Sequence, residues 1–360
     1  MPEHPSAAGR RPRGRGTALN PSGRFEALRL TPDPDFDPAE LPAPRTQFFP
    51  DSAESLITYN DSPDVGFTAS LNIYRGCEHG CSYCFARPFH EYLGQSAGLD
   101  FETKIFVKTD APALLRRELS HRRWKPQGVV MSGVTDCYQP AERSFKLTRA
   151  CLEVFAEFRN PVSIITKNAL VTRDIGVLAE LAKFGAARVF LSVTTLDAHL
   201  ARRMEPRAAA PDFRLRAIRE LSAAGIPVGV MVAPLIPGLT DVEMPAILAA
   251  ARDAGARWAG YVLLRLPHGV KDIFLAWLDE NEPSKKARII DRLRECRGGR
   301  LYDARWGVRG KGTGIMAEQL GQLFQVAARR CGYADEVPPL SFAHFRVPGR
   351  PRQLDLIPGF

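Results

Sequence analysis

Three cysteines lie close together in the run RGCEHGCSYC, which covers residues 75–84. Their spacing is CxxxCxxC, with the thiols on Cys77, Cys81 and Cys84. Thiolates this close in sequence can ligate one compact metal centre, and the two glycines of the run allow the backbone to fold tightly around it. A cubane iron–sulfur cluster held by three cysteines keeps one iron without a protein ligand, so a second molecule can chelate that iron. The run therefore predicts a 4Fe–4S cluster with one open coordination position.

A zinc site is the alternative for the same thiols, with His79 or His90 as the fourth ligand. Zinc sites usually pair their ligands as CxxC with a second pair elsewhere in the chain. The other cysteines of this chain are scattered and offer no such pair. The sequence therefore favours iron–sulfur chemistry over zinc, and it predicts no second cluster.

Beyond residue 66 the chain alternates between two patterns. Apolar runs are followed by amphipathic helical patterns, and a repeat of roughly 30 residues is typical of βαβ units. The runs are FTASLNIY, GVVMSGV, PVSIITK, RVFLSVTT, PVGVMVAPLI and AGYVLLRLP. Continuous apolar strands between helices indicate a parallel sheet covered by those helices. About six such strands predict an α/β fold with a partial (β/α)6 TIM-like barrel, and a doubly wound sheet fits the same pattern.

Three of the helical patterns run from an aspartate to a glycine, over residues 174–185, 212–225 and 241–255. Aspartate is favoured as an N-cap and glycine just beyond a helix C-terminus, so we expect these residues to bound helices. Ligands bind at the carboxyl ends of the strands in barrels and in doubly wound sheets alike. The residues after each strand, together with the cysteine run, are therefore the candidate site.

Composition divides the chain into four parts. Residues 1–24 carry five Arg and one Glu among many Gly and Pro, which predicts a disordered basic tail. Residues 25–65 form a proline-rich leader, residues 66–284 the partial barrel and residues 285–360 a basic C-terminal extension. No apolar stretch approaches the roughly 18–20 residues that cross a bilayer, and no apolar segment follows the N-terminal arginines. We therefore expect no membrane partner and a cytoplasmic location, where seven unpaired cysteines would stay reduced.

The cysteine run, with an aromatic residue before its third cysteine and a βα repeat behind it, resembles the radical S-adenosylmethionine superfamily. The segments YRGCEHGCSYCFARPFHEYLG, SGVTDCYQPAERSFKLTR, ITKN, LSVTT and PVGVMVAPLIPGLTD resemble, more narrowly, the spore photoproduct lyase-like branch, often labelled DNA repair photolyases. The resemblance covers about residues 66–300. It implies that the open iron takes S-adenosylmethionine, and that one electron from the cluster releases a 5′-deoxyadenosyl radical. It also implies an external electron donor of the flavodoxin or ferredoxin type.

The resemblance further implies contacts to S-adenosylmethionine. Tyr83 matches the aromatic residue that packs near the adenine, and a half-buried loop aromatic is its structural alternative. Lys167 matches a lysine that faces the carboxylate, which suits an ammonium group; a solvated lysine at a strand end is the alternative. Ser132, Thr135 and Asp136 stand where many members have a Gly-Gly-Glu stretch that holds the amino group. This chain departs from that stretch, and we expect Thr135 or Asp136 to take over.

Two later strands add candidates. Ser192, within LSVTT, is expected to hydrogen-bond the ribose or the carboxylate. Val232 is expected to line the adenine pocket, with core packing as its alternative. Glu205 and Arg207, in RRMEPR, form either a salt bridge at a helix edge or a contact to cofactor or substrate.

Cys137 and Tyr138 follow the second apolar run at the same sheet edge, and both are candidate catalytic residues. Cys137 is a candidate hydrogen donor to a substrate radical, with a small buried core cysteine as the alternative. Spore photoproduct lyase uses a cysteine for this step, but that cysteine aligns near Gly133 of this chain. The departure weakens the assignment of thymine photoproduct repair.

The sequence therefore predicts an enzyme that cleaves S-adenosylmethionine reductively and abstracts hydrogen from an unidentified substrate. Residues 285–311 hold ten Lys or Arg and three Asp or Glu, with Tyr302 and Trp306 among them. Basic residues interleaved with aromatic ones can bind a phosphate backbone and stack a base, so nucleic acid is a candidate partner or substrate. A solvated basic tail and a charged helix face account for the same residues. The alternatives are a DNA repair lyase acting on thymine photoproducts and a non-catalytic Fe–S or zinc protein that binds nucleic acid.

Overall fold

The computed structural model of the chain describes residues 12–26 and 44–349. An open seven-stranded sheet forms its centre, with the strand order β10-β9-β8-β7-β6-β3-β2. The strands are β2 (Ile57–Tyr59), β3 (Ala69–Leu71), β6 (Val129–Met131), β7 (Val162–Thr166), β8 (Ala187–Ser192), β9 (Val228–Leu235) and β10 (Trp258–Leu263). Strands β3 to β10 of this sheet pair in parallel, and β2 is antiparallel at the edge. Six parallel strands in an open sheet confirm the predicted α/β class and partial barrel.

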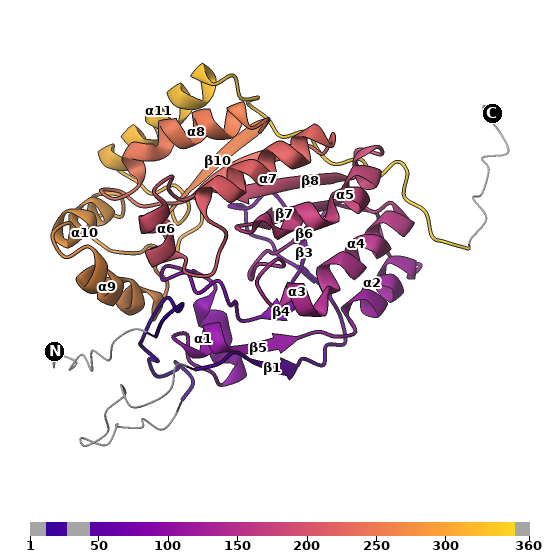
Figure 1. The fold of residues 1–360 in the computed structure, drawn as a ribbon, viewed down its shortest axis with the longest axis horizontal. Helices are drawn as coiled ribbons and strands as arrows, with labels where there is room; N and C mark the ends of the chain where they lie inside the picture. The colour runs from indigo at the N-terminus through magenta and orange to yellow at the C-terminus, as the bar shows by residue number, and fades with distance from the viewer. Residues whose placement is uncertain (1–11, 27–43, 350–360) are drawn as a thin grey trace.

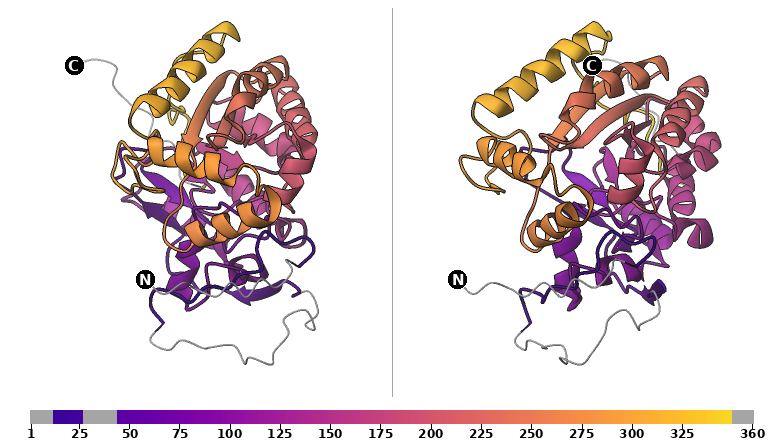
Figure 2. Two further views of the ribbon diagram at one scale, coloured as in Figure 1. Left: turned by 90° about the vertical axis from the view of Figure 1, so that its left-hand side faces the viewer. Right: turned by 60° about the vertical axis from the view of Figure 1, so that its left-hand side comes forward.

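The helices follow the strands in alternation, as the repeat predicts. They are α1 (Asp100–Thr103), α2 (Ala111–Ser120), α3 (Glu142–Phe145), α4 (Leu147–Phe158), α5 (Ile175–Ala182), α6 (Ala198–Met204), α7 (Pro211–Ala223), α8 (Met244–Asp253), α9 (Val270–Asn281), α10 (Lys286–Glu295) and α11 (Ile315–Arg330), with short 3-10 helices η2 (Arg87–Leu93), η3 (Ala169–Asp174) and η4 (Asp241–Glu243). Figure 1 shows α2, α4, α5 and α8 along the outer side of the sheet, and Figures 1 and 2 place α11 and residues 12–26 at opposite ends of the described part of the molecule.

Alternation along the strands separates the two faces of the sheet. Residues such as Ile164, Leu191 and Val230 pack with the helices in the main hydrophobic core. Their chain neighbours point the other way, toward the inside of the open barrel. We call this second set the inner face; it includes Ser163, Ile165, Arg188, Phe190, Ser192 and Met231.

The glycines predicted to end helices are confirmed, whereas none of the three aspartates predicted as N-caps makes a side-chain cap. Gly185, Gly225 and Gly255 have φ angles of 63°, 77° and 104°, in the left-handed region that glycine tolerates. Asp174 makes no side-chain cap and bonds the Tyr138 hydroxyl instead. Asp197 is the aspartate that does cap a helix, because its carboxylate accepts from two backbone N–H groups at the start of α6.

A second, three-stranded sheet leads into the cysteine run. It has the order β1-β5-β4, formed by β1 (Gln47–Pro50), β4 (Tyr74–Arg75) and β5 (Lys104–Val107). The predicted strand FTASLNIY is therefore divided between β3 in the main sheet and β4 in this one. Since β4 ends two residues before Cys77, the small sheet sets where the run begins.

Residues 12–26 form an arm against the cysteine run, which corrects the predicted disordered tail for the part of 1–24 that is described. Arg15 is buried and donates to the Glu102 carbonyl at 2.8 Å, and the Gly16 N–H donates to the Glu102 carboxylate at 2.8 Å. The rest of the predicted tail (1–11) and the leader residues 27–43 lie outside the described residues. The arm therefore covers the segment that follows the cysteines.

The C-terminal extension also packs on the barrel. Pro338 accepts from Arg188 at 2.7 Å, and the Arg346 N–H donates to the Phe158 carbonyl at 2.9 Å. Residues 350–360 of the predicted extension lie outside the described part. Across the part of the chain that is described, no helix combines the length and apolar character needed to span a bilayer.

Two glycine substitutions test the helix boundaries. In Gly255→Ala the new Cβ would lie 2.4 Å from the Ser222 hydroxyl oxygen, at a φ of 104°. We expect this variant to lose about 1–3 kcal/mol of unfolding free energy in a denaturant titration. Gly176→Ala is the matched control, because nothing lies within 4 Å of its added Cβ and alanine favours the helix. Equal losses in both variants would contradict the account.

Candidate functional site

The cysteine run forms a tight loop directly after β4. The Cys77 N–H donates to the Phe101 carbonyl at 2.9 Å, and the Cys84 N–H donates to the Cys81 carbonyl at 3.2 Å. Gly76 has a φ of 80°, and a Cβ there would lie 3.0 Å from two backbone carbonyl oxygens. The loop therefore needs glycine at this position, as the sequence predicts.

The three thiols are enclosed by protein. Cys77 and Cys81 are 6% exposed, and Cys84 is partly buried. Burial raises the pKa of Cys77 and Cys81 well above the usual thiol value, and it also raises that of Cys84. The charges of Lys167 and Arg214 oppose the shift at Cys81, and the charge of Arg87 opposes it at Cys84.

This donor set fits an iron–sulfur cluster. Iron binds thiolates, so loading must remove the protons of the buried thiols. The three cations stabilise the negative charge that results, because electrostatic attraction is strong in a buried site. Among the residues that the structure describes, no three His, Cys, Asp or Glu side chains are grouped so as to hold a single metal ion.

Arg87 braces the cysteine loop through hydrogen bonds to backbone carbonyls. Its guanidinium donates twice to the Cys81 carbonyl, at 3.0 and 2.9 Å, and once to the Gly98 carbonyl at 2.8 Å. It also pairs with Glu102, and neither side chain is exposed. A fully buried arginine fixed at both ends holds the middle cysteine in place. The sequence offered no signal for this brace beyond the nearness of Arg87 to the cysteines.

Lys167 and Tyr83, two of the predicted cofactor residues, lie together beside the loop. The Lys167 ammonium donates to the Ala233 carbonyl at 2.7 Å and lies 5.8 Å from the centroid of the Tyr83 ring. Burial, and next the charge of Arg214, lower the pKa of Lys167 to about 8. The ammonium is therefore mostly charged at neutral pH and close to the cysteines, where an anionic group could bind it.

Glu205 joins this group and is central to it. Its carboxylate accepts from the Tyr83 hydroxyl and, at 2.7 Å, from the Thr194 hydroxyl, and it lies 3.6 Å from the Lys167 ammonium. Its second oxygen pairs with Arg214, and both side chains are buried. Glu205 thus forms a buried ion pair at the C-terminal end of α6, which matches the salt-bridge alternative given for it. Thr194 and Arg214 are site residues that sequence reasoning missed.

Arg207 contacts a different acid. Its guanidinium pairs with Glu78 of the cysteine loop at 2.9 Å, and its backbone N–H donates to the His79 carbonyl at 3.3 Å. The RRMEPR segment therefore fixes the cysteine loop through Arg207 and the Lys167 environment through Glu205.

Asp136 positions Lys167 from the neighbouring strand end. One carboxylate oxygen accepts from the Thr166 hydroxyl at 2.7 Å, and the other accepts from the Lys167 N–H at 2.8 Å. The hydroxyls of Ser132 and Thr135 form hydrogen bonds with backbone groups. The Ser132 oxygen accepts from the Cys137 N–H at 2.7 Å, and Thr135 donates to the Tyr74 carbonyl. Of the three residues predicted to hold an amino group, only Asp136 lies against Lys167.

Two predicted cofactor contacts occupy other positions. Val232 belongs to the main core with the helices, on the opposite face of β9 from Met231 and Ala233. This position matches the core-packing alternative, and its predicted place in an adenine pocket stays a prediction. Ser192 lies on the inner face, and its carbonyl accepts from Arg214 at 2.9 Å.

Cys137 and Tyr138 are packed in the main core. Cys137 is 3% exposed and Tyr138 is fully buried. The Tyr138 hydroxyl donates to Asp174 at 2.9 Å, on the helix side of the sheet. Burial raises the pKa of Cys137 well above the usual thiol value. These positions match the alternative of a buried core residue, and the catalytic roles stay a prediction.

The two histidines of the zinc alternative are engaged or enclosed. His79 has Asp136 3.5 Å from Nδ1 and the Asn168 amide 3.2 Å from Nε2. His90 packs edge-on against Phe101 and Phe106, and neither of its ring nitrogens finds a hydrogen-bond partner among the described residues. Burial lowers the pKa of each histidine to about 4, so both are neutral near pH 7.

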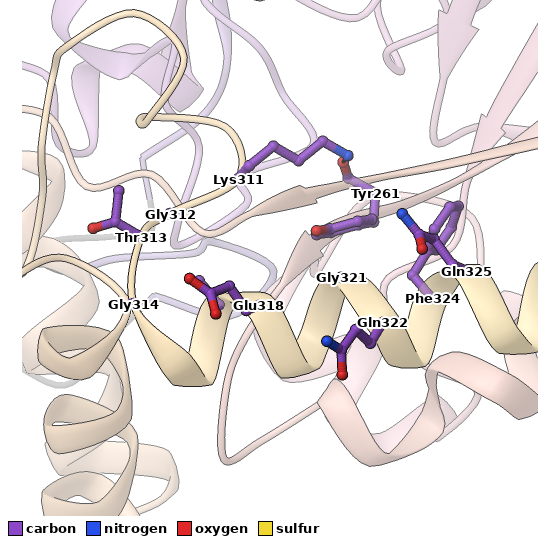
Figure 3. A pocket seen from close by; sticks show the side chains of 11 residues that line it. Tyr261, Lys311, Gly312, Thr313, Gly314, Glu318, Gly321, Gln322, Phe324 and Gln325 are labelled. Atoms are coloured by element: carbon purple, nitrogen blue, oxygen red, sulfur yellow. Dashed lines mark hydrogen bonds between the residues drawn. The ribbon is translucent and has the colours of Figure 1, made fainter.

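A hollow of about 630 Å³ lies elsewhere, between β10 and α11. Figure 3 shows Tyr261 and Lys311 above the helix residues Glu318 and Gln322. The Lys311 ammonium lies 3.7 Å from the Tyr261 ring centroid. Tyr261 packs in the helix-facing core, so this hollow is separate from the inner face and contains none of the predicted site residues.

Comparison with known proteins agrees with this geometry. The family model described as the radical SAM superfamily matches residues 71–251, a range that contains the cysteine run, Lys167 and Glu205. An uncharacterized protein of Mycobacterium tuberculosis is 37% identical over 231 residues, which are 64% of this chain and 67% of that protein. An uncharacterized protein of Methanocaldococcus jannaschii is 32% identical over 173 residues, 48% of this chain and 62% of its own.

Solved structures of spore photoproduct lyase share the fold. The lyase complexed with dinucleoside spore photoproduct superimposes with a TM-score of 0.55 and 16% identity over 79% of each chain. A cysteine-to-serine mutant of the same lyase gives a TM-score of 0.56 and 17% identity, again over 79% of each chain. At this level of identity the likeness establishes the arrangement of strands and helices.

Removing the charge of Glu205 tests its structural role. Glu205→Gln would leave Arg214 buried without a counter-charge, which costs about 3–5 kcal/mol of unfolding free energy. Glu220→Gln is the matched control, because Glu220 pairs with Arg216 at the surface, where such pairs contribute at most about 1 kcal/mol. Denaturant titration measures both variants. A loss for Glu205→Gln no larger than that of the control would show that the buried pair is not needed.

His90 gives the protein a pH-dependent stability. Between pH 6.5 and about 4 the unfolded chain binds the His90 proton while the folded protein does not, so unfolding free energy falls as pH falls. We expect His90→Phe to reduce this slope by up to about 1.4 kcal/mol per pH unit, because phenylalanine fits an aromatic pocket and has no proton to bind. Denaturant titrations across this range provide the measurement. An unchanged slope would contradict the burial of a neutral His90.

Proposed function

The chain belongs to the radical SAM superfamily, and from that premise we propose that it is an enzyme that cleaves S-adenosylmethionine reductively and abstracts hydrogen from a substrate. The cluster would be held by Cys77, Cys81 and Cys84. One observation carries the proposal: three enclosed thiols on one loop lie beside a partly buried lysine at the carboxyl ends of parallel strands. When bound, the reduced 4Fe–4S cluster supplies the electron that converts S-adenosylmethionine to methionine and a 5′-deoxyadenosyl radical.

Lys167 and the residues that contact it would hold the methionine end of S-adenosylmethionine. The Lys167 ammonium would bind the carboxylate of S-adenosylmethionine through a charge-assisted hydrogen bond. Asp136 positions Lys167 for this contact, because its carboxylate accepts from the Lys167 backbone N–H. That ammonium now contacts Glu205 and donates to the Ala233 carbonyl. It would give up part of these interactions when the S-adenosylmethionine carboxylate binds. Tyr83 stays beside the site because its hydroxyl is bound to Glu205.

The surrounding protein would exclude water and support electron delivery. The arm 12–26 and the Arg87–Glu102 pair close one side of the loop. Excluding water protects a reactive radical from side reactions. We further propose a flavodoxin- or ferredoxin-type electron donor and a reducing, cytoplasmic setting, in line with seven unpaired cysteines.

A lyase acting on thymine photoproducts is a second candidate, favoured by the shared fold with spore photoproduct lyase. Gly133 stands where the hydrogen-donating cysteine of that enzyme aligns. A Cβ at Gly133 would lie 3.2 Å from the Ser70 side chain, so a cysteine there would require Ser70 to move. The reaction on this chain would then need a hydrogen donor other than a thiol at this position.

Nucleic acid is the partner class that we propose for the segment 285–311. Within it Trp306 is 54% exposed, and the side chain of Arg305 is 72% exposed. The first half of the segment is α10, which buries Ile289 and Leu293. The tryptophan and Arg305 come from the loop after α10, and α10 itself adds exposed cations such as Arg294, so a phosphate backbone and a base could reach this segment.

Product formation tests the proposal. The anaerobically reconstituted protein, reduced with dithionite, should form 5′-deoxyadenosine from S-adenosylmethionine, measured by chromatography. Cys81→Ala should abolish product and lose iron, because the cluster needs all three thiolates. Cys331→Ala is the control, as Cys331 is a partly exposed cysteine outside the loop, and it should retain both. A wild-type protein with an intact cluster and no product would sink the proposal.

A charge-removing variant tests the role of Lys167. Lys167→Gln should weaken S-adenosylmethionine binding about tenfold or more, since a charge-assisted hydrogen bond contributes roughly 1.5–3 kcal/mol. Lys183→Gln is the control, because Lys183 is exposed and pairs with Glu180. Equilibrium dialysis on cluster-loaded protein gives both affinities. Equal affinities would remove Lys167 from the binding site.

A further inference from the structure

Arg265 lies beside the cysteine loop at the end of the last barrel strand. It follows β10 by two residues, between Leu264 and Leu266, which are buried in one hydrophobic cluster with Cys81 and Tyr83. Its guanidinium carbon lies 4.7 Å from the centroid of the Phe85 ring, and Phe85 directly follows the third cysteine. Arg265 therefore stands at the edge of the sheet where ligands of such folds bind.

The guanidinium of Arg265 has no counter-charge of its own. Its Nε is buried without a hydrogen-bond partner, and the side chain makes no hydrogen bond or ion pair with any described residue. Asp64, whose pKa the charge of Arg265 helps to lower, is bonded by the Arg309 guanidinium and by the Gly307 N–H. A buried donor without a partner is costly, so a position that keeps one invites a ligand.

The neighbouring charges favour an anion there. Arg297 is 2% exposed and uses its donors on the carbonyls of Leu264, Val308 and Arg309. It therefore brings a positive charge to the same corner without a carboxylate partner. Because the Asp64 carboxylate already pairs with Arg309, it does not neutralise the positive charges of Arg265 and Arg297.

We propose that Arg265 binds a phosphate group of the substrate and so anchors the substrate beside the cluster; this rests on the proposed function. Stacking on Phe85 fixes the plane of the guanidinium and leaves its N–H edge free for the oxygens of the phosphate. Arginine presents this planar fork to phosphate oxygens, which a lysine cannot match. The net positive corner around Arg265 and Arg297 would add a longer-range attraction for a phosphate-bearing molecule.

A purely structural role accounts for less. Arg87, Arg214 and Arg297 show what structural arginines of this chain do: each makes hydrogen bonds to backbone carbonyls or a buried carboxylate, even though the Nε of Arg297 also lacks a partner. Arg265 alone among these four makes no such bond within the described residues. Its aromatic contact explains its orientation, but it leaves the donors without acceptors.

Equilibrium dialysis with radiolabelled inorganic phosphate tests the proposal on the cluster-loaded protein. Arg265→Gln should weaken phosphate binding about tenfold or more, because a charge-assisted hydrogen bond is lost. Arg216→Gln, which removes an exposed arginine of α7, should bind phosphate as the wild type does. Arg265→Lys keeps the charge, serves if the glutamine variant does not fold, and should bind more weakly than wild type. Acetate should compete much less than phosphate.

The outcomes separate clearly. Phosphate binding that is equal in wild type, Arg265→Gln and Arg265→Lys, or equal competition by acetate, would overturn the assignment. Thymidine monophosphate and oligo(dT) then identify the source of the phosphate, since the tighter Arg265-dependent ligand indicates either a free nucleotide or a nucleic-acid strand. A wild type that binds phosphate through Arg265 but forms no 5′-deoxyadenosine would contradict the proposed function and leave this inference standing.

Discussion

The cysteine loop is held between two fully buried ion pairs, Arg87–Glu102 and Arg214–Glu205. Burying a charge costs several kcal/mol, and only an opposite charge with good hydrogen bonds offsets that cost. The first pair fixes the backbone of Cys81 through its carbonyl. The second fixes the group that contains Tyr83 and Lys167. Such pairs are weak evidence for stability, but they place charges at defined points, which is what a thiolate-bound cluster requires.

The parallel sheet brings the remaining groups to the same edge. Each strand end contributes one side chain or carbonyl: Asp136 after β6, Lys167 after β7, Thr194 after β8 and Ala233 on β9. Since alternate residues of a strand face opposite sides, the register decides which of them meet at the site. It places Ala233 toward Lys167 and directs Val232 into the helix-facing core. The same geometry delivers Arg265 at the end of β10.

Much of this could be predicted from the sequence, because its signals are local. The cysteine spacing, the strand–helix rhythm and the glycines that end helices each depend on a few neighbouring residues. Lys167 and Tyr83 were named by the family resemblance, and the structure places them side by side. Glu205, in contrast, accepts a hydrogen bond from Tyr83 of the cysteine loop, although the two residues are over 120 positions apart in the chain. No spacing rule specifies such a pairing.

The sequence leaves other features open for physical reasons as well. Val232 and Tyr138 sit near the correct sheet edge, but sequence alone does not say which face a residue takes when a strand is apolar on both sides. The predicted disorder of residues 1–24 rested on composition, whereas the Arg15 guanidinium and the Gly16 N–H both find acceptors on Glu102. A basic, glycine-rich segment can thus be ordered when a buried carboxylate is there to receive it.

Electron paramagnetic resonance of the reduced protein, recorded with and without S-adenosylmethionine, tests the central claim most directly. The account predicts a reduced 4Fe–4S signal that depends on Cys77, Cys81 and Cys84 and that changes when S-adenosylmethionine binds the open iron. An iron–sulfur signal that S-adenosylmethionine leaves unchanged, or a protein that takes up zinc and forms no cluster, would contradict it.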